Sequence, residues 1–198
     1  MSWSVSRLSV AAWMLGGVAV AAEPAGGDLD VVTVTATRLA MPSFNIPAAI
    51  STVSGSQLRN DALGVNLADD IATVPGLLAR NRNNYAQDQQ ISIRGFGANS
   101  TFGIRGVRVY QDGIPASGPD GQGQVSQFNL DSAGRVEILR GPFSALYGNS
   151  SGGVIQIFTA DGSGPPQLST GVAYGSFGEF RAGANLSGST GPLAYNVD

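Results

Sequence analysis

The sequence predicts a small α+β domain of short strands and two short helices, followed by a separate set of antiparallel strands. Glycine accounts for 28 of the 198 residues and charged residues for only 13%, a composition that favours a turn-rich β protein over a helical bundle. Up to Ala160, short apolar-alternating runs are separated by loops rich in glycine, serine and asparagine. After Gln167 the alternation continues in longer runs joined by turns, which indicates a different β structure.

The missing residue types exclude several classes of chemistry. The sequence has no cysteine and no histidine, which excludes zinc sites built on those ligands, cysteine nucleophiles and Ser-His-Asp triads. All eleven basic residues are arginine, so a Walker-type phosphate loop and a Schiff-base lysine are excluded as well. The formal net charge of −3 argues against nucleic-acid binding. We expect neither an enzyme nor a resident metal or cofactor, although composition by itself excludes only the classes named above.

Residues 1–22 are predicted to be a secretory signal peptide. Arg7 and the amino terminus give a positive start, an apolar run of residues 10–20 follows, and small residues offer a cleavage site after residue 21 or 22. The apolar run is too short for a stable membrane span. The alternative, a buried N-terminal helix, is disfavoured by the Gly16-Gly17 pair.

Residues 23–37 are expected to form a flexible N-terminal segment that contains a potential β-strand. Its polar start, EPAGGD, gives no reason to pack, but the next residues have very high β propensity. They form either an ordinary edge strand or an extended segment that adds as a strand to another protein's sheet. The residues concerned are Asp30, Val31, Val32, Thr33, Val34, Thr35 and Ala36.

Residues 38–160 are predicted to be the α+β domain. Asn66 is a candidate N-cap for a helix in which Leu67, Ile71 and Val74 share one face. Pro75 and Gly76 end this helix. A second short helix is expected at residues 144–147, before Gly148. The predicted strands cover residues 50–53, 91–94, 107–111, 135–140 and 153–159.

A cationic, glycine-rich stretch lies in the middle of this domain. Between positions 80 and 108, Asp88 is the only acid, and the local charge of this stretch is therefore about +4. The basic residues are Arg80, Arg82, Arg94, Arg105 and Arg108. Loops carried on rigid strands often hold binding residues, and a cationic cluster suits an anionic ligand.

The last residues, 161–198, resemble the start of a transmembrane β-barrel. Leu168, Val172 and Tyr174 alternate with small or polar residues, and the same pattern recurs from Phe180 and again from Leu193. A soluble β-meander is the alternative. Three strands cannot close a barrel and a membrane tolerates no open sheet edge, so the sequence is expected to be an N-terminal fragment or a truncated product of a longer chain.

The order of the motifs resembles one family, the TonB-dependent outer-membrane receptors. The motifs are DVVTVTATR, PAAISTVSGSQL, LADDIATVPGL, ISIRGFG, VRVYQDGIP and VEILRGPFSALYGNSSGGVIQIFT. The resemblance implies that residues 38–160 form a plug domain inside a barrel of about 22 strands that begins in residues 161–198. It implies that Asp30–Ala36 is the TonB box, which pairs with TonB, and that the protein resides in the outer membrane of a Gram-negative bacterium. The partners implied are TonB with its inner-membrane energising complex, a small-molecule ligand, and outer-membrane lipid and lipopolysaccharide, with no nucleic acid.

The resemblance also assigns roles to loops and charges. The loops at residues 80–90, 97–103 and 116–124 would contact the ligand. The candidate ligand-binding residues are Arg80, Arg82, Asn83, Asn84, Tyr85, Asn99, Phe102, Arg105, Asp120, Gln122 and Gln124. Arg94, Glu137 and Arg140 match positions that lock plug to barrel wall in the family. Arg59 and Arg135 are expected to be solvated, and Arg108 to be structural.

Within this family, the middle stretch is similar to receptors for pyrroloquinoline quinone, a planar aromatic tricarboxylate. The shared points include NYAQD, GIRG and PDGQGQ. A ferric citrate-type or other anionic siderophore would suit the same side chains. Two other classes of function remain as alternatives: a passive porin or adhesin, and a saccharide-processing enzyme using Asp112 and Asp120. Both aspartates precede a glycine, and turns explain them more simply.

Overall fold

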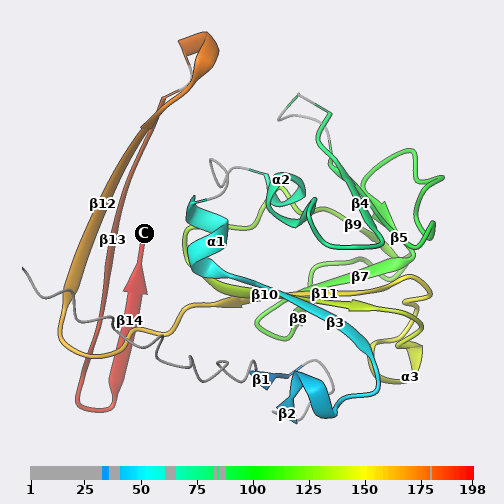
Figure 1. Ribbon diagram of the computed structural model, residues 1–198, viewed down its shortest axis with the longest axis horizontal. Coiled ribbons are helices and arrows are strands. Elements are labelled where there is room, and N and C mark those ends of the chain that lie inside the picture. The colour runs from blue at the N-terminus through cyan, green and yellow to red at the C-terminus, as the bar shows by residue number, and fades with distance from the viewer. Residues whose placement is uncertain (1–32, 36–40, 61–65, 83, 85–87, 179) are drawn as a thin grey trace, which may run out of the picture. The chain divides into compact units, whose positions relative to one another are not determined.

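The computed structural model describes residues 33–35, 41–60, 66–82, 84, 88–178 and 180–198 (Figure 1). The predicted signal peptide, residues 1–22, lies outside the described residues. The helices and strands before the tail are β1 (Thr33–Val34), β2 (Met41–Pro42), η1 (Ser43–Asn45), β3 (Ala49–Ser54), α1 (Gly55–Asn60), α2 (Leu67–Ile71), β4 (Leu77–Arg80), β5 (Gln90–Ile93), β6 (Ile104–Arg105), β7 (Val107–Gln111), β8 (Ile114–Pro115), β9 (Gln122–Gly123), β10 (Ala133–Arg140), α3 (Ser144–Tyr147) and β11 (Gly153–Thr159).

A five-stranded mixed sheet with the order β3-β10-β11-β7-β8 is the centre of the domain. Strand β10 is antiparallel to both of its neighbours, whereas β11 and β7 are parallel. The register places Ile138 opposite Ile155, and Ile155 opposite Val109, so that these side chains share one face. The predicted α+β class with a short mixed sheet and short helices is confirmed.

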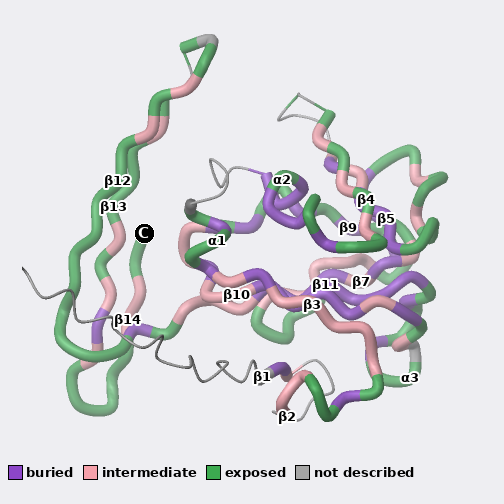
Figure 2. The backbone as a smooth tube through the Cα atoms, in the orientation of Figure 1, coloured by how far each residue is buried: buried purple, intermediate pink, exposed green. Residues whose placement is uncertain are grey.

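The main core lies on the face of this sheet that carries α1 and α2. Leu58, Leu67 and Ile71 from the two helices join the same buried cluster as Ile138 and Ile155. Figure 2 shows buried residues concentrated along the central strands and on α2. Glu137 and Leu139 alternate with the core residues and therefore lie on the opposite face of β10.

Helix α1 was not predicted, although a local signal for it exists. Ser54 and Gln57 form a capping box: Gln57 N donates to Ser54 Oγ at 3.3 Å, and Ser54 N donates to Gln57 Oε1 at 2.9 Å. Leu58 is fully buried beneath the helix. The motif S-x-x-Q and one anchoring leucine are enough to define a helix that is too short to show periodicity.

Helix α2 begins where predicted, but its cap comes from a distant residue. Asn66 has the extended backbone of an N-cap, yet it is Gln89 Oε1 that accepts from Ala68 N, at 2.8 Å. Gln89 Nε2 donates to Asn66 Oδ1 at 3.0 Å. The helix ends at Ile71 rather than reaching Val74, and the proline at position 75 disfavours helical backbone at Val74, the residue before it.

The tail forms a sheet of its own with the order β12-β13-β14, from Gln167–Tyr174, Phe180–Thr190 and Leu193–Val197, with η2 (Ser176–Gly178) in the first turn. All pairs are antiparallel, and Leu168 lies opposite Leu186. Apolar residues on this face are exposed, with Val172 at 74% and Tyr174 at 78%. The three runs predicted to be strands are therefore strands in the structure. Within the described residues, no helix has the length and apolarity needed to cross a membrane.

Candidate functional site

Two of the loops expected to face a ligand are brought together by a short pair of strands. Strand β6 follows the loop of residues 97–103, β9 lies inside the loop of residues 116–124, and the two are antiparallel with Arg105 opposite Gln122. Gly103 makes this approach possible. A Cβ at this position would lie 2.5 Å from Gly123 O, and its φ of +59° is one that favours glycine.

The loop of residues 116–124 is held by its own hydrogen bonds. Gly118 N donates to Gln122 O at 2.7 Å, and Gln122 N donates to Asp120 Oδ1 at 3.1 Å. Asp120 thus stabilises a turn, as aspartate often does two residues before a backbone N–H. Arg108 NH1 donates to Gly118 O at 2.9 Å, so the arginine expected to be structural fastens this loop to β7.

A cleft of about 340 Å³ lies where the two loops meet. Three candidate ligand-binding residues line it: Phe102, Gln122 and Gln124. Phe102 is 73% exposed, which leaves its ring available for stacking. The remaining lining residues are Asp88, Gly103, Ala116, Gly123 and Gln127. Neither Asp88 nor Gln127 was predicted from the sequence to be a binding residue.

The candidate arginines are exposed, and none of them is among the residues that line this cleft. Arg82 NH2 donates to Thr101 O at 3.2 Å, which ties the loop that begins at residue 80 to the loop of residues 97–103. Arg80 ends β4 and Arg105 ends β6, both with exposed side chains. Asn84 and Asn99 are also exposed. Asn83 and Tyr85 lie outside the described residues.

The described part of the predicted TonB box lies against the central sheet. Residues Thr33–Val34 form β1 and pair with β2, and Val34 is fully buried. Thr35 N donates to both carboxylate oxygens of Glu137, at 3.3 and 3.1 Å. Asp30, Val31, Val32 and Ala36 lie outside the described residues.

Glu137 has 0% exposure and a second partner on its own strand. Arg135 Nε donates to Glu137 Oε1 at 2.8 Å, and Arg135 NH2 donates to Thr35 Oγ1 at 3.3 Å. The guanidinium also lies 4.1 Å from the centre of the Phe158 ring. We call Thr35, Arg135 and Glu137 the Glu137 clasp. Arg135 was expected to be solvated; its side chain keeps 35% exposure but also pairs with Glu137, because residues two apart on a strand share a face.

The other residues predicted to hold plug to barrel have different surroundings. Arg140 NH1 donates to Pro75 O at 2.5 Å and Arg140 NH2 donates to Ser51 Oγ at 3.0 Å, so this side chain fastens β10 to β3 and to the turn after α2. Arg94 has an exposed side chain and a positive φ of 51°. Contacts of these residues with a barrel wall stay a prediction.

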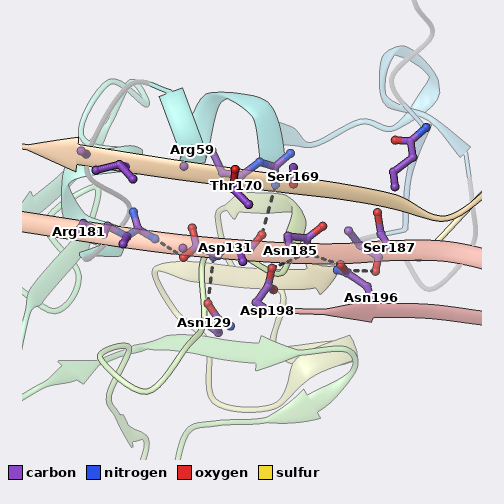
Figure 3. A pocket seen from close by; sticks show the side chains of 18 of the residues that line it. Arg59, Asn129, Asp131, Ser169, Thr170, Arg181, Asn185, Ser187, Asn196 and Asp198 are labelled. Carbon is purple, nitrogen blue, oxygen red and sulfur yellow. Dashed lines mark hydrogen bonds and ion pairs between the residues drawn. The ribbon is translucent and has the colours of Figure 1, made fainter.

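A larger, open cavity of about 1040 Å³ contains none of the candidate ligand-binding residues. Figure 3 shows its polar lining, in which Arg181 pairs with Asp131 and Asn185 Nδ2 donates to Asn196 Oδ1 at 2.6 Å. Asn196 Nδ2 also donates to Ala160 O at 3.1 Å. This cavity and the cleft between the loops are separate features of the described chain.

The sequence is similar to a known protein family and to curated proteins of known name. A model of the family described as TonB-dependent Receptor Plug Domain matches residues 42–154, which is more than half of the chain. The vitamin B12 transporter BtuB of Photobacterium profundum is 30% identical over 169 residues, covering 84% of this chain and 26% of that protein. The ferrienterobactin receptor of Escherichia coli is 31% identical over 166 residues, covering 75% of this chain and 21% of the receptor.

Solved structures of outer-membrane receptors are also similar to this chain. The ferric yersiniabactin uptake receptor FyuA of Yersinia pestis is 30% identical with a TM-score of 0.55, covering 72% of this chain and 22% of the receptor. The pyoverdine receptor FpvA of Pseudomonas aeruginosa has a TM-score of 0.62 at 23% identity, covering 80% of this chain and 22% of the receptor, which shows a shared fold. The chain thus spans about a quarter of the length of the curated relatives it matches. With the mixed sheet, the loop cleft and the family match together, the chain belongs to the TonB-dependent receptor plug domain family.

Proposed function

We propose that this chain is the plug and first barrel strands of an outer-membrane receptor that binds a scarce anionic small molecule and imports it actively. Support comes from the family match and from relatives that are named as transporters and receptors. The observations that carry the proposal are the cleft between residues 97–103 and 116–124 and the exposed arginines Arg80, Arg82 and Arg105 of the same domain. Guanidinium groups bind carboxylates through two parallel hydrogen bonds.

The aromatic and amide side chains at the cleft, together with exposed arginines outside its lining, favour a planar ligand with carboxylate groups. Phe102 offers an exposed aromatic face, Gln122 and Gln124 offer amides, and Arg82 is already fixed near the rim through Thr101. Pyrroloquinoline quinone, a planar aromatic tricarboxylate, satisfies these requirements and is our first candidate. A ferric siderophore, of the citrate type or another anionic type, is the second candidate, and the receptors for ferrienterobactin and ferric yersiniabactin among the relatives favour the siderophore class.

Import would be energised through the N-terminal segment. In this proposal Asp30–Ala36 pairs with TonB in the periplasm, and the Glu137 clasp holds the end of the box until the ligand is bound. The apolar face of β12–β14 would contact outer-membrane lipid and lipopolysaccharide. Arg94, Glu137 and Arg140 are proposed to contribute to holding the plug in the barrel.

Direct binding to the complete receptor tests the ligand. Dissociation constants for pyrroloquinoline quinone and for ferric citrate would be measured by calorimetry with the detergent-solubilised receptor. We expect tight binding of the quinone, and a loss of about tenfold or more in each of Arg80→Ala and Arg82→Ala, because each removes a charge-assisted hydrogen bond. Arg59→Ala is the matched control, since Arg59 is an exposed arginine whose guanidinium contacts the backbone near Asp131.

These binding results test the identity of the ligand and leave the family assignment unchanged. Binding of ferric citrate alone would replace the quinone by the siderophore class. Unchanged affinity in both arginine variants would remove these arginines from the site. Binding of neither ligand would remove both named candidates.

A further inference from the structure

The loop of residues 97–103 is fixed at both ends and in its middle by groups from other elements. At its ends, a Cβ on Gly97 would lie 2.6 Å from Arg105 O, and a Cβ on Gly103 would lie 2.5 Å from Gly123 O. In its middle, two side chains from outside the loop donate hydrogen bonds to its carbonyl groups. The position of this loop is therefore determined by contacts that its own sequence does not contain.

The shorter of these two hydrogen bonds comes from Gln90, the first residue of β5. Gln90 Nε2 donates to Ala98 O at 2.8 Å, whereas Arg82 NH2 donates to Thr101 O at 3.2 Å. Gln90 is half-buried and was not among the candidate binding residues. Its amide thus holds the half of the loop that Arg82 does not reach.

The register of β4 and β5 places Gln90 directly opposite Arg80. Residues directly opposite each other in an antiparallel pair have their side chains on the same face, with Cβ atoms about 5 Å apart. Ala98, which the Gln90 side chain contacts, therefore lies on the face of this pair that carries Arg80. The loop is linked in this way to two candidate arginines, although neither of them lines the cleft.

The part of the loop that carries Phe102 is folded onto itself. Ser100 Oγ donates to Phe102 O and Gly103 O, at 2.8 and 3.0 Å, and Ser100 N donates to Gly97 O at 3.1 Å. These bonds join the first residue of the loop to the last. A displacement at Ala98 is therefore expected to displace Phe102 as well.

We propose that Gln90 is a positioning residue of the ligand site. It holds the loop of residues 97–103 against the β4–β5 pair, so that Asn99 and Phe102 keep one position relative to Arg80 before the ligand arrives. This inference rests on the proposed function, and it adds that the site is preformed, with the loop joining an aromatic side chain of the cleft to arginines outside it. A preformed loop strengthens binding because the ligand does not have to order it.

Hydrogen exchange of the complete receptor without ligand tests whether Gln90 fixes the loop. Gln90→Met removes both N–H donors and keeps a side chain of similar length. Mass spectrometry should show faster exchange in residues 97–103 and unchanged exchange in β7 and β11. Unchanged exchange in residues 97–103 overturns the inference. Because this measurement needs no ligand, it is independent of the proposed cargo.

The dissociation constant of the complete receptor tests the consequence for binding. The probe is pyrroloquinoline quinone, or ferric citrate if the wild type binds only that. Gln90→Met should raise the dissociation constant about threefold to tenfold, the effect of one lost hydrogen bond. In a background with Asn99→Ala and Phe102→Ala, the same substitution should change it by less than about twofold, because Gln90 acts through the loop. No rise in the single variant, or an equal rise in both backgrounds, overturns the inference.

Gln57→Met is the matched control. It removes a glutamine hydrogen bond of the same kind from the capping box of α1, where Gln57 Oε1 accepts from Ser54 N at 2.9 Å. We expect a dissociation constant within about twofold of the wild type and unchanged exchange in residues 97–103. An equal loss of affinity in Gln57→Met would indicate a general loss of stability and overturn the positioning role. If the wild type binds neither probe, both named ligands are removed, and the exchange measurement still decides whether Gln90 holds the loop.

Discussion

Glu137 combines complete burial with a formal charge, and its partners explain how both are possible. The carboxylate accepts from the backbone N–H of Thr35 and from the Arg135 side chain, and the guanidinium lies against the Phe158 ring. Removal of one member of such a set leaves a buried polar group without its partner, which is strongly destabilising. The clasp therefore links the N-terminal segment to β10 through residues about one hundred positions apart in the sequence.

Glu137→Gln should loosen this link without removing bulk. The amide keeps one acceptor for Thr35 N but loses the charge that pairs with Arg135, at a cost of about 1–2 kcal/mol. We expect the complete receptor without ligand to bind the periplasmic domain of TonB about tenfold more tightly, measured by calorimetry. Asp69→Asn is the charge-matched control. Unchanged TonB affinity in Glu137→Gln would show that the clasp does not restrain the box.

The cleft requires glycine at position 103, because a side chain there would separate β6 from β9. Gly103→Ala combines a strained φ of +59° with a contact of 2.5 Å to Gly123 O, so β6 and β9 must separate. Gly113→Ala is a matched control, because Gly113 has a φ of +80° but open space around its Cβ position. We expect both to cost about 1–2 kcal/mol from the backbone alone, and only Gly103→Ala to abolish ligand binding. Equal binding in both variants would contradict the role assigned to the β6–β9 pair.

At the scale of elements, local sequence determined the strands better than the short helices. The predictions for residues 107–111 and 153–159 coincide with β7 and β11, because alternating β-branched residues belong to buried strands of the central sheet. Helix α1 was missed although its capping box is a local signal, and β4 was not predicted because it is stabilised by pairing with β5. The extended run predicted around residues 30–36 contains only Thr33–Val34 as a strand in the described chain.

In the candidate site, too, some features could be predicted from the sequence and others could not. Motif order placed the three loops, but spacing alone could not reveal that Asp88 bonds to Gln124 or Arg82 to Thr101, since these partners are 36 and 19 positions apart. The bond between Arg135 and Glu137 was within reach of sequence reasoning, because residues two apart on a strand lie on the same face.

The capping box of α1 offers a test at the element scale. Ser54→Ala removes the hydroxyl that accepts from Gln57 N, and the loss of an N-cap of this type costs about 0.5–2 kcal/mol. Hydrogen exchange of the complete receptor, followed by mass spectrometry, should show faster exchange in residues 55–60 and unchanged exchange in β7 and β11. Unaltered protection of residues 55–60 would mean that the burial of Leu58 alone holds the helix.

At the scale of the whole molecule, the two faces of the central sheet have different tasks. One face carries α1, α2 and the main core, whereas the other carries Glu137, whose carboxylate bonds to Thr35 at the end of the predicted TonB box. The strands of the sheet and of β4–β6 also support the loops that form the proposed ligand cleft. In the proposed receptor, this arrangement connects a ligand site to an N-terminal segment through one rigid sheet.

The most direct test of the account is energised uptake by cells that carry the complete receptor with residues 30–36 deleted. Uptake and surface binding of labelled pyrroloquinoline quinone would be measured in parallel with the intact receptor. We predict that deletion abolishes uptake and leaves surface binding unchanged, because the cleft does not include those residues. Uptake that continues at the full rate after the deletion would contradict active import and favour a passive pore.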